Sequence, residues 1–286
     1  MIINSNLCNA MADLHVHTTV SDGKKTPDEV IRTASKNNLT AIAITDHDTV
    51  LGIEIALNEA EKFGLEIIPG VEFSIAFSKD MHILGLFVDY KNISLNRHLR
   101  KITRTRMRLI AQAFRVVQNY GIDVLPQQVK DSKHYVSLKT LSEYLLENKL
   151  VIDEKEADLL LNNIWDEWRN CLPTAKECIE MIHECNGLAV LAHAKLLNLN
   201  DDELESLLVD LRDFGLDAVE LIHPKHSIED TKKLEHWADS LGLLHSGGSD
   251  YHGKEEQDMM ISEKENKNIV PYSYVEKMKA VLEEKK

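Results

Sequence analysis

Residues 12–23, ADLHVHTTVSDG, place three polar side chains directly after a short apolar run. His15 and His17 stand two positions apart, and because alternate residues of a β-strand face the same side, both imidazoles would point in one direction. Asp22 follows in an Asp-Gly pair that by itself is typical of a surface turn. The pair of histidines is equally consistent with metal binding and with structural hydrogen bonding, so the outcome depends on partners elsewhere in the chain.

Strand-type and helix-type runs alternate on either side of a long helical segment. Strands are predicted at 12–16, 40–48, 65–74, 81–89, 188–194, 216–224 and 243–253, and helices at 26–38, 50–64, 174–187, 201–215 and 228–242. This alternation predicts a parallel sheet or a barrel made from one. We therefore expect an α/β fold, a βα barrel of seven strands formed by residues 1–90 and 173–286, with a helical insertion subdomain at 91–172.

The composition limits the classes of protein to consider. The chain has 286 residues and a formal net charge of −14, which disfavours a general nucleic-acid-binding surface because long polyanions require a basic footprint. No apolar run is long enough to span a bilayer, and the first residues lack the pattern of a signal peptide. The four cysteines form no CxxC pair. We expect a cytoplasmic protein that binds no long nucleic acid and no membrane.

Six segments of the chain carry His, Asp or Glu beside predicted strand ends. The nine candidate metal ligands are His15, His17, Asp22, His47, Glu72, His82, His193, Asp250 and His252. In a βα barrel the loops after the strands build the active site on one rim, so these side chains would converge there. His82 is the exception, because it starts its predicted strand, and we expect that boundary to shift by a few residues. Chance alone is a poor explanation for six separate segments that each carry such residues at the same end of the strands. The pattern therefore predicts a metal site.

The charge of this set suits an anionic substrate. With neutral histidines its three carboxylates carry −3, so two divalent ions would leave +1 and three would leave +3. Either value gives an electropositive site in an acidic protein, suited to a phosphoryl dianion. Closely spaced metals hydrolyse phosphate esters through a metal-activated hydroxide. Nitrogen and oxygen ligands without thiolates favour two or three Mn, Fe or Zn ions per chain as the cofactors.

The motifs DLHVHTTVSDG, AITDHDT, GVEFS, HILG, LAH and GGSDYHG resemble those of the PHP (polymerase and histidinol phosphatase) superfamily of phosphoesterases, and most of all its TrpH/YciV-type branch. The resemblance covers nearly the whole chain, with all nine ligand positions in order. It implies a distorted (β/α)7 barrel with an inserted helical subdomain. The sequence departs from the pattern in two places. HYVSLKTLSEYL at 134–145 stands where this branch usually has an Arg-Pro-His element, and Ala194 stands where a proline usually follows the histidine at 193.

The resemblance also implies three sets of metal ligands. One set is His15, His17, Glu72 and Asp250, the second is Glu72 as a bridge with His82 and His193, and the third is Asp22, His47 and His252. The implied activity is hydrolysis of phosphomonoesters of small nucleotides, such as nucleoside 3′,5′-bisphosphates, with inorganic phosphate as a product. The alternatives are a histidinol-phosphate-type phosphatase and a 5′-3′ exonuclease on short oligonucleotides. A non-catalytic metal-binding domain is disfavoured, because no ligand of the pattern is missing.

Three further residues are candidates for contact with the substrate. Arg106 has mostly apolar helical neighbours, so it would lie on the buried stripe of its helix and need an anionic partner such as a phosphate. An arginine at this point also resembles the family pattern. His223 and His226, in ELIHPKHS, follow the sixth predicted strand. His223 would contact the substrate or act as a general acid. The other candidate catalytic residues are four of the metal ligands: His15, His17, Glu72 and Asp250.

Overall fold

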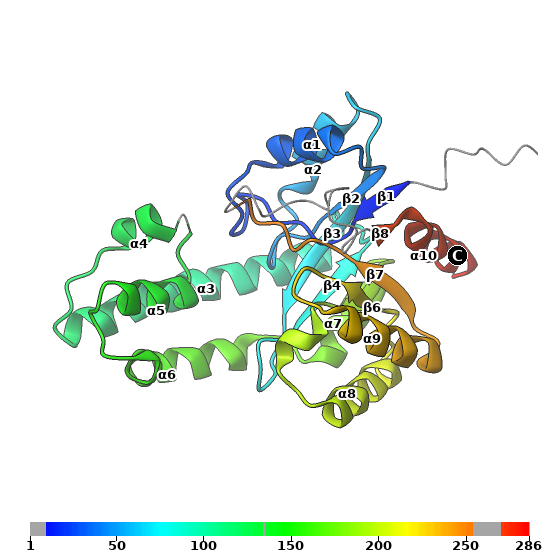
Figure 1. Ribbon diagram of the computed structural model, residues 1–286. Coiled ribbons are helices and arrows are strands. Elements are labelled where there is room, and N and C mark those ends of the chain that lie inside the picture. Colours follow the sequence, from blue (N-terminus) through cyan, green and yellow to red (C-terminus); the bar gives the residue numbers. More distant parts are fainter. Residues whose placement is uncertain (1–9, 134, 254–269, 286) are drawn as a thin grey trace, which may run out of the picture. The chain divides into compact units, whose positions relative to one another are not determined.

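The computed structural model describes residues 10–133, 135–253 and 270–285. It divides the chain into two compact units: residues up to Asn96 together with those from Pro173 form one, and Arg97–Leu172 form the other. All described strands belong to the first unit, and the second is helical (Figure 1). The sequence analysis set the start of the insertion at residue 91, slightly before the second unit begins.

One sheet of eight strands runs through the first unit, in the order β7-β6-β5-β4-β3-β2-β1-β8. The strands are β1 (Met11–Asp13), β2 (Ala41–Ile44), β3 (Glu66–Ser74), β4 (His82–Leu86), β5 (Leu188–Leu191), β6 (Ala218–Ile222), β7 (Leu244–Gly247) and β8 (Val270–Pro271). The helices of this unit are α1 (Pro27–Lys36), α2 (Ile53–Ala60), α7 (Ala175–Glu184), α8 (Asp201–Asp213), α9 (Ile228–Leu241), α10 (Tyr272–Glu284) and the 3-10 helix η2 (Ala194–Leu197). The α/β barrel is confirmed, and the short β8 is an addition that the sequence did not predict.

The barrel closes where the residues after β1 meet the end of β7 and the segment that follows it. The backbone N–H of Leu14 donates to the carbonyl of Gly247 at 3.1 Å, and that of His17 donates to the carbonyl of Tyr251 at 2.9 Å. Val16 and Tyr251 form a parallel bridge beyond the named strands. These bonds bring residues 15–17 beside residues 250–252, although the two segments lie near opposite ends of the sequence.

Strand β4 runs opposite to the direction that the sequence analysis assumed. It pairs antiparallel with both β3 and β5, whereas the other neighbouring pairs from β1 to β7 are parallel. Only residues 75–81 join β3 to β4, and a parallel crossover requires a dozen residues or more. The expectation of an all-parallel barrel was therefore wrong at this strand. The strand does begin at His82, so the expected shift of this boundary was wrong, and the reversal places His82 beside Ser74, at the end of β3.

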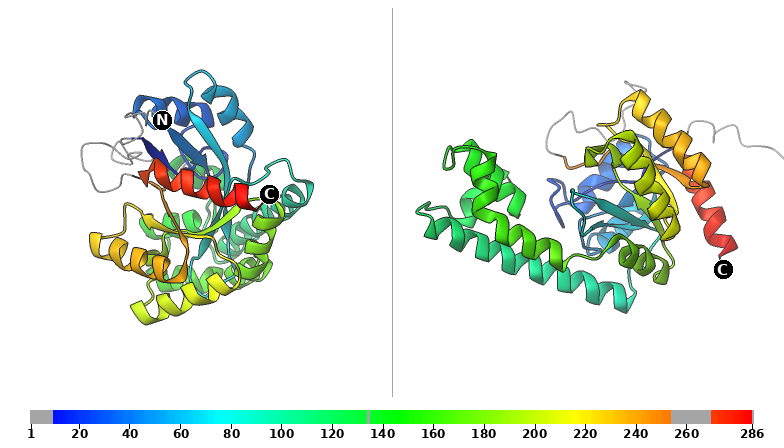
Figure 2. Two further views of the ribbon diagram at one scale, coloured as in Figure 1. Left: turned by 90° about the vertical axis from the view of Figure 1, so that its right-hand side faces the viewer. Right: turned by 90° about the horizontal axis from the view of Figure 1, so that it is seen from below.

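Helix α10 covers the end of the barrel opposite to the candidate ligands. Val275 and Met278 pack into a buried cluster with Leu188 and Ala218, which begin β5 and β6. In Figure 2, α10 lies across this end of the strands. Because the candidate ligands follow the opposite, C-terminal strand ends, the helix lies away from them.

Local sequence signals explain where several barrel helices begin and end. Thr174, Asn200 and Ser227 each accept a hydrogen bond from the backbone N–H three residues later, at the starts of α7, α8 and α9. An acidic residue at that third position completes a capping box in each case. Gly242 ends α9 in the left-handed conformation, with φ of 69°. These caps fix the lengths of the helices and so the positions of the strands that follow them.

The helical unit has its own apolar core. It contains most of α3 (Ile93–Asn119), with α4 (Pro126–Lys133), α5 (Leu138–Glu147) and α6 (Glu154–Cys171). Leu109, Val117, Leu141 and Leu161 are fully buried in one cluster that draws on these helices. Within the described part of the chain, no helix combines the length and the apolar character needed to cross a membrane.

Replacing Gly248 with alanine should destabilise the closed barrel. A Cβ atom at this position would lie 2.3 Å from the Cβ of His15 and 2.5 Å from its backbone nitrogen, so the two closing segments would have to separate. Gly64→Ala is the comparison, since a Cβ there meets nothing within 4 Å and costs only about 1–2 kcal/mol for its left-handed backbone. We expect Gly248→Ala to lower the free energy of unfolding in urea by clearly more. Equal losses in the two variants would contradict this account of the closure.

Candidate metal centre

The structure brings all nine candidate ligands together at the C-terminal ends of the parallel strands. Their ligand atoms lie within 4.8 Å of one another in four overlapping groups: His17, Asp22, His47 and His252; His15, Glu72 and His193; His15, His17 and Asp250; and His47, Glu72 and His82. We call these nine residues the nine-residue cluster. The groups share members, so the cluster is one continuous set of ligands rather than four separate sites.

Glu72 lies at the centre of the cluster and is completely buried. Its Oε2 atom lies 3.1–3.3 Å from nitrogens of His15, His17 and His47, and its Oε1 atom lies 2.9–3.1 Å from nitrogens of His82 and His193. The two oxygens of one carboxylate thus face two different sets of imidazoles. Glu72 could therefore serve two of the ligand sets that the family resemblance implies.

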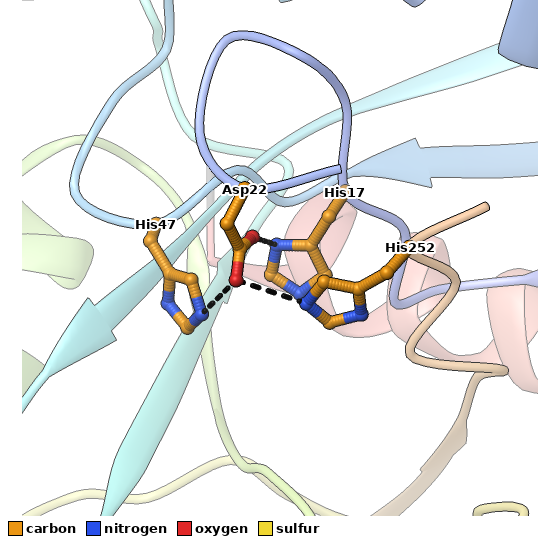
Figure 3. Close-up of side chains that lie close together, drawn as sticks. All are labelled: His17, Asp22, His47 and His252. Atoms are coloured by element: carbon orange, nitrogen blue, oxygen red, sulfur yellow. Dashed lines mark hydrogen bonds and ion pairs between the residues drawn. The ribbon is translucent and has the colours of Figure 1, made fainter. Parts of the chain in front are cut away.

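Asp22 connects three imidazoles on another side of the cluster (Figure 3). Its carboxylate oxygens lie 3.2 Å from Nε2 of His252, 3.6 Å from Nδ1 of His17 and 3.9 Å from Nε2 of His47. The loop after β1 therefore turns back and places the carboxylate of Asp22 beside the ring of His17. The Asp-Gly pair does form part of a turn, but its carboxylate points into the cluster.

Two cluster residues have left-handed backbones, which non-glycine residues rarely adopt. Asp250 has φ of 50° and His193 has φ of 31°. Such residues cost about 1–3 kcal/mol each and occur most often at functional sites. Asp250 uses this conformation to place its Oδ1 atom 3.2 Å from Nε2 of His17 and 3.5 Å from Nε2 of His15.

The cluster fits metal ions because its buried polar atoms lack other partners. Among the described residues, Nε2 of His15, both ring nitrogens of His17, Nδ1 of His47 and Oε2 of Glu72 are buried and form no hydrogen bond. Leaving several such atoms unpaired is costly, whereas coordination to a cation satisfies all of them at once. The ligand atoms in the four groups are imidazole nitrogens and carboxylate oxygens, which suit Mn, Fe and Zn.

The pKa shifts in the cluster reflect close pairing between its carboxylates and its imidazoles. Burial alone would lower the pKa of His17 and His82, yet neighbouring carboxylates outweigh it and raise both values to about 10. Burial would raise the pKa of Glu72, but the surrounding imidazoles hold it well below its usual value. His47 differs, because burial dominates and lowers its pKa to about 4. Without metals, protons on the histidines balance these carboxylates, and bound cations would replace those protons.

Two buried aspartates that the sequence analysis did not single out hold the ligand-bearing loops. Asp46 accepts hydrogen bonds from the N–H and hydroxyl of Thr18 at 2.7 and 2.8 Å and from the hydroxyl of Ser21 at 2.6 Å. Asp13 accepts from the N–H and hydroxyl of Ser249 at 2.9 and 2.5 Å. Their signal in the sequence is a carboxylate in or directly after an apolar strand run, a place where an unpartnered charge would be costly.

A third such carboxylate, Glu220, lies within β6 and is also completely buried. It accepts hydrogen bonds from the ring of His15 at 3.0 Å and from the backbone N–H of His193 at 2.6 Å. The signal is the same, a glutamate between Val219 and Leu221 in an apolar strand. The sequence does not identify its role, because its partners, His15 and the N–H of His193, come near only in the folded barrel.

The three candidate substrate contacts occupy different places. His223 lies beside the cluster, with Nε2 3.6 Å from Oδ2 of Asp250. His226 is one ring further away, its centroid 5.1 Å from that of His223. Arg106 belongs to the helical unit, where its guanidinium carbon lies 5.1 Å from the centre of the Trp168 ring.

A barrel that gathers nine His, Asp and Glu ligands at one end of its strands, around a shared buried carboxylate, defines a metal-dependent phosphoesterase. The chain belongs to the PHP domain family, whose model matches residues 13–270. A solved amidohydrolase structure from Chromobacterium violaceum has the same fold, with a TM-score of 0.75 and 25% identity over 95% of this chain and 96% of that one.

Curated relatives carry the names of several phosphoesterases. A phosphoribosyl 1,2-cyclic phosphate 1,2-diphosphodiesterase of Eggerthella lenta is 30% identical over 85% of this chain and 94% of its own length. A 5′-3′ exoribonuclease, Rnm, of Escherichia coli is 30% identical over 84% of each chain. A 3′,5′-nucleoside bisphosphate phosphatase of Chromobacterium violaceum is 27% identical over 85% of this chain and 87% of its own length.

Removing a ligand at the centre of the cluster should remove metal and activity without unfolding the protein. We expect His17→Ala and Asp250→Ala each to lose at least one bound ion per chain and to lower turnover by more than about 100-fold, the upper end for residues that only orient ligands. His245→Ala is the control, since that imidazole contacts Asp239 outside the cluster. Metal analysis, phosphate release and urea unfolding measure the three quantities. Full metal content in either cluster variant would contradict the assignment.

Proposed function

We propose that the protein hydrolyses phosphomonoesters of small nucleotides, such as nucleoside 3′,5′-bisphosphates, with inorganic phosphate as a product. The observation that carries the proposal is the nine-residue cluster with Glu72 shared between two sets of imidazoles. The bisphosphate phosphatase among the relatives supports this choice of substrate class. The cytoplasmic location stays a prediction.

The proposed ligand sets are those that the family resemblance implies, and contacts within each set support them. His15, His17, Glu72 and Asp250 would hold one ion, Glu72 with His82 and His193 a second, and Asp22 with His47 and His252 a third. When bound, divalent Mn, Fe or Zn ions supply a hydroxide nucleophile at neutral pH and hold the phosphoryl oxygens.

We propose three metal ions per chain, one for each ligand set. Besides the three carboxylates of the cluster, Glu220 contributes a further negative charge against the ring of His15. Divalent ions bound to the cluster would offset these charges and attract a phosphoryl dianion.

His223 is proposed as the general acid or as a donor to the substrate. Its Nδ1 atom accepts a hydrogen bond from the backbone N–H of Lys225 at 3.1 Å, so in the neutral ring the proton lies on Nε2. That Nε2 atom is buried and lies 3.6 Å from Oδ2 of Asp250. His223 can therefore donate a proton or a hydrogen bond to a phosphoryl or leaving-group oxygen beside the cluster.

His226 is proposed to bind the substrate as a hydrogen-bond acceptor, whereas His223 is a donor. Its Nδ1 atom donates to the carbonyl of Leu221 at 3.0 Å, which leaves a lone pair on the buried Nε2. Burial lowers the pKa of His226, so the lone pair persists at neutral pH. Arg106 is proposed to bind a phosphate of the substrate, because a guanidinium stacked on an aromatic ring has a fixed orientation suited to bidentate contact.

The two histidines should affect different kinetic constants. We expect His223→Gln to lower kcat by about 100-fold or more, the usual loss when a general acid is removed, with metal content unchanged. His226→Gln should instead raise KM and leave kcat close to that of the native protein. Steady-state kinetics on one substrate, with metal analysis of both variants, separates these effects. A loss of metal in His223→Gln would show that this residue is a ligand and not an acid.

A second candidate function is 5′-3′ exonuclease activity on short RNA, which the exoribonucleases of Escherichia coli and Haemophilus influenzae favour at 30% and 29% identity. Substrate length distinguishes the two. The acidic charge of −14 predicts that activity falls as the oligonucleotide lengthens, because each added phosphate is repelled by the rest of the surface.

Phosphate release and product analysis with a defined panel test the proposal. The panel contains adenosine 3′,5′-bisphosphate, 3′-AMP, AMP, histidinol phosphate, a ribose 1,2-cyclic phosphate and 5′-phosphorylated RNA of two to ten nucleotides, each with Mn²⁺-loaded and chelator-treated protein. We expect the bisphosphate to give the highest kcat/KM and the chelator to abolish turnover. Preferred cleavage of the RNA into mononucleotides would favour the exonuclease, and no hydrolysis of any member by the loaded protein would contradict the proposed function.

A further inference from the structure

Glu220 joins two ligands that come from different strands. It lies in the middle of β6, between Val219 and Leu221, and is completely buried. One carboxylate oxygen accepts from Nδ1 of His15, which follows β1, and the other accepts from the backbone N–H of His193, which follows β5. A single side chain outside the nine-residue cluster thus contacts two of its members.

Both groups that face Glu220 must donate. The backbone N–H of His193 has no acceptor capacity. His15 directs Nε2 into the cluster, 3.3 Å from Oε2 of Glu72 and 3.5 Å from Oδ1 of Asp250, and it can bind a metal through that atom only if its remaining proton lies on Nδ1. A carboxylate accepts at both oxygens, so it satisfies both donors and selects this tautomer.

An amide of the same shape cannot do this. A glutamine at position 220 would have to use its oxygen for the N–H of His193, because that donor cannot change. Its NH₂ group would then face Nδ1 of His15, which can accept that bond only by moving its own proton to Nε2. A proton on Nε2 occupies the lone pair that would coordinate the metal.

The second contact fixes a backbone turn. His193 has φ of 31° and ψ of 49° and leads directly into η2, so its ring direction depends on an unusual conformation. The hydrogen bond from its N–H to Glu220, at 2.6 Å, holds this turn in place.

We propose that Glu220 is a positioning residue that sets the tautomer of His15 and the backbone of His193, and so controls metal binding at the sets that contain these two ligands. This inference rests on the metal centre of the proposed function but not on its substrate. The set of Asp22, His47 and His252 contains neither ligand, so its affinity for metal should not depend on Glu220.

Glu220→Gln tests the inference, with Asp217→Asn as a matched control. Asp217 precedes β6, and its Oδ2 atom accepts from both Nε2 of His183 at 2.7 Å and the backbone N–H of Ala189 at 2.8 Å, the same pair of donor types outside the cluster. Its Oδ1 atom pairs with Nζ of Lys285 at 2.8 Å, so the control also removes a surface ion pair. In titrations with Co²⁺ followed by its absorption, Glu220→Gln should bind the ions of the two affected sets about 10–100-fold more weakly and keep the third. Asp217→Asn should match the native protein. Unchanged affinity in Glu220→Gln, or an equal loss in the control, would overturn the inference.

Nitrogen-15 NMR of the zinc-loaded protein reads the tautomer directly. We expect a proton on Nδ1 of His15 in the native protein and an unprotonated Nδ1 in Glu220→Gln. The double variant His15→Ala with Glu220→Gln should lose no more metal at the His15 set than His15→Ala alone. If Glu220→Gln does not fold, the native spectrum still decides, since an unprotonated Nδ1 on His15 would refute the tautomer assignment. These readouts use no substrate, so a protein that binds metal as described but releases no phosphate would contradict the proposed function alone.

Discussion

The carboxylate of Glu72 contacts five imidazoles, and the rest of the barrel is arranged so that these contacts form. A buried carboxylate is costly unless cations surround it, and five histidines from β1, β2, β4 and β5 segments supply that environment with protons or with metals. No pair of these histidines except His15 and His17 is close in sequence. The cluster therefore exists only when the barrel closes, which couples folding to metal binding.

Closure and reversal are the two features of the fold that make this possible. The hydrogen bonds of Leu14 and His17 to the end of β7 and the segment after it bring Asp250 beside the histidines that follow β1. The reversal of β4 brings His82 to the same end as Glu72, because its first residue pairs with Ser74. With β4 parallel, His82 would lie at the opposite end of the barrel, and one ligand set would be incomplete.

The sequence predicted the barrel, its strands from β1 to β7 and the candidate ligands, because strand-end His and Asp residues and apolar runs are local signals. The direction of β4 follows from the short link at 75–81, which is too short for a parallel crossover. The position of His82 at a strand start was attributed to an uncertain strand boundary instead of to a reversed strand. Glu220 and Asp13 were missed because a buried carboxylate acts through partners that only the closed barrel brings near. The place of Arg106 relative to the substrate depends on tertiary structure that helical periodicity does not encode.

The nine-residue cluster is proposed as a metal centre for three ions. Anomalous X-ray diffraction from crystals grown with Mn²⁺, recorded on both sides of the metal absorption edge, would detect these ions. We expect three peaks per chain within the cluster, one of them beside each ligand set and two sharing Glu72. Full density for these side chains with no anomalous peak among them would refute the metal centre.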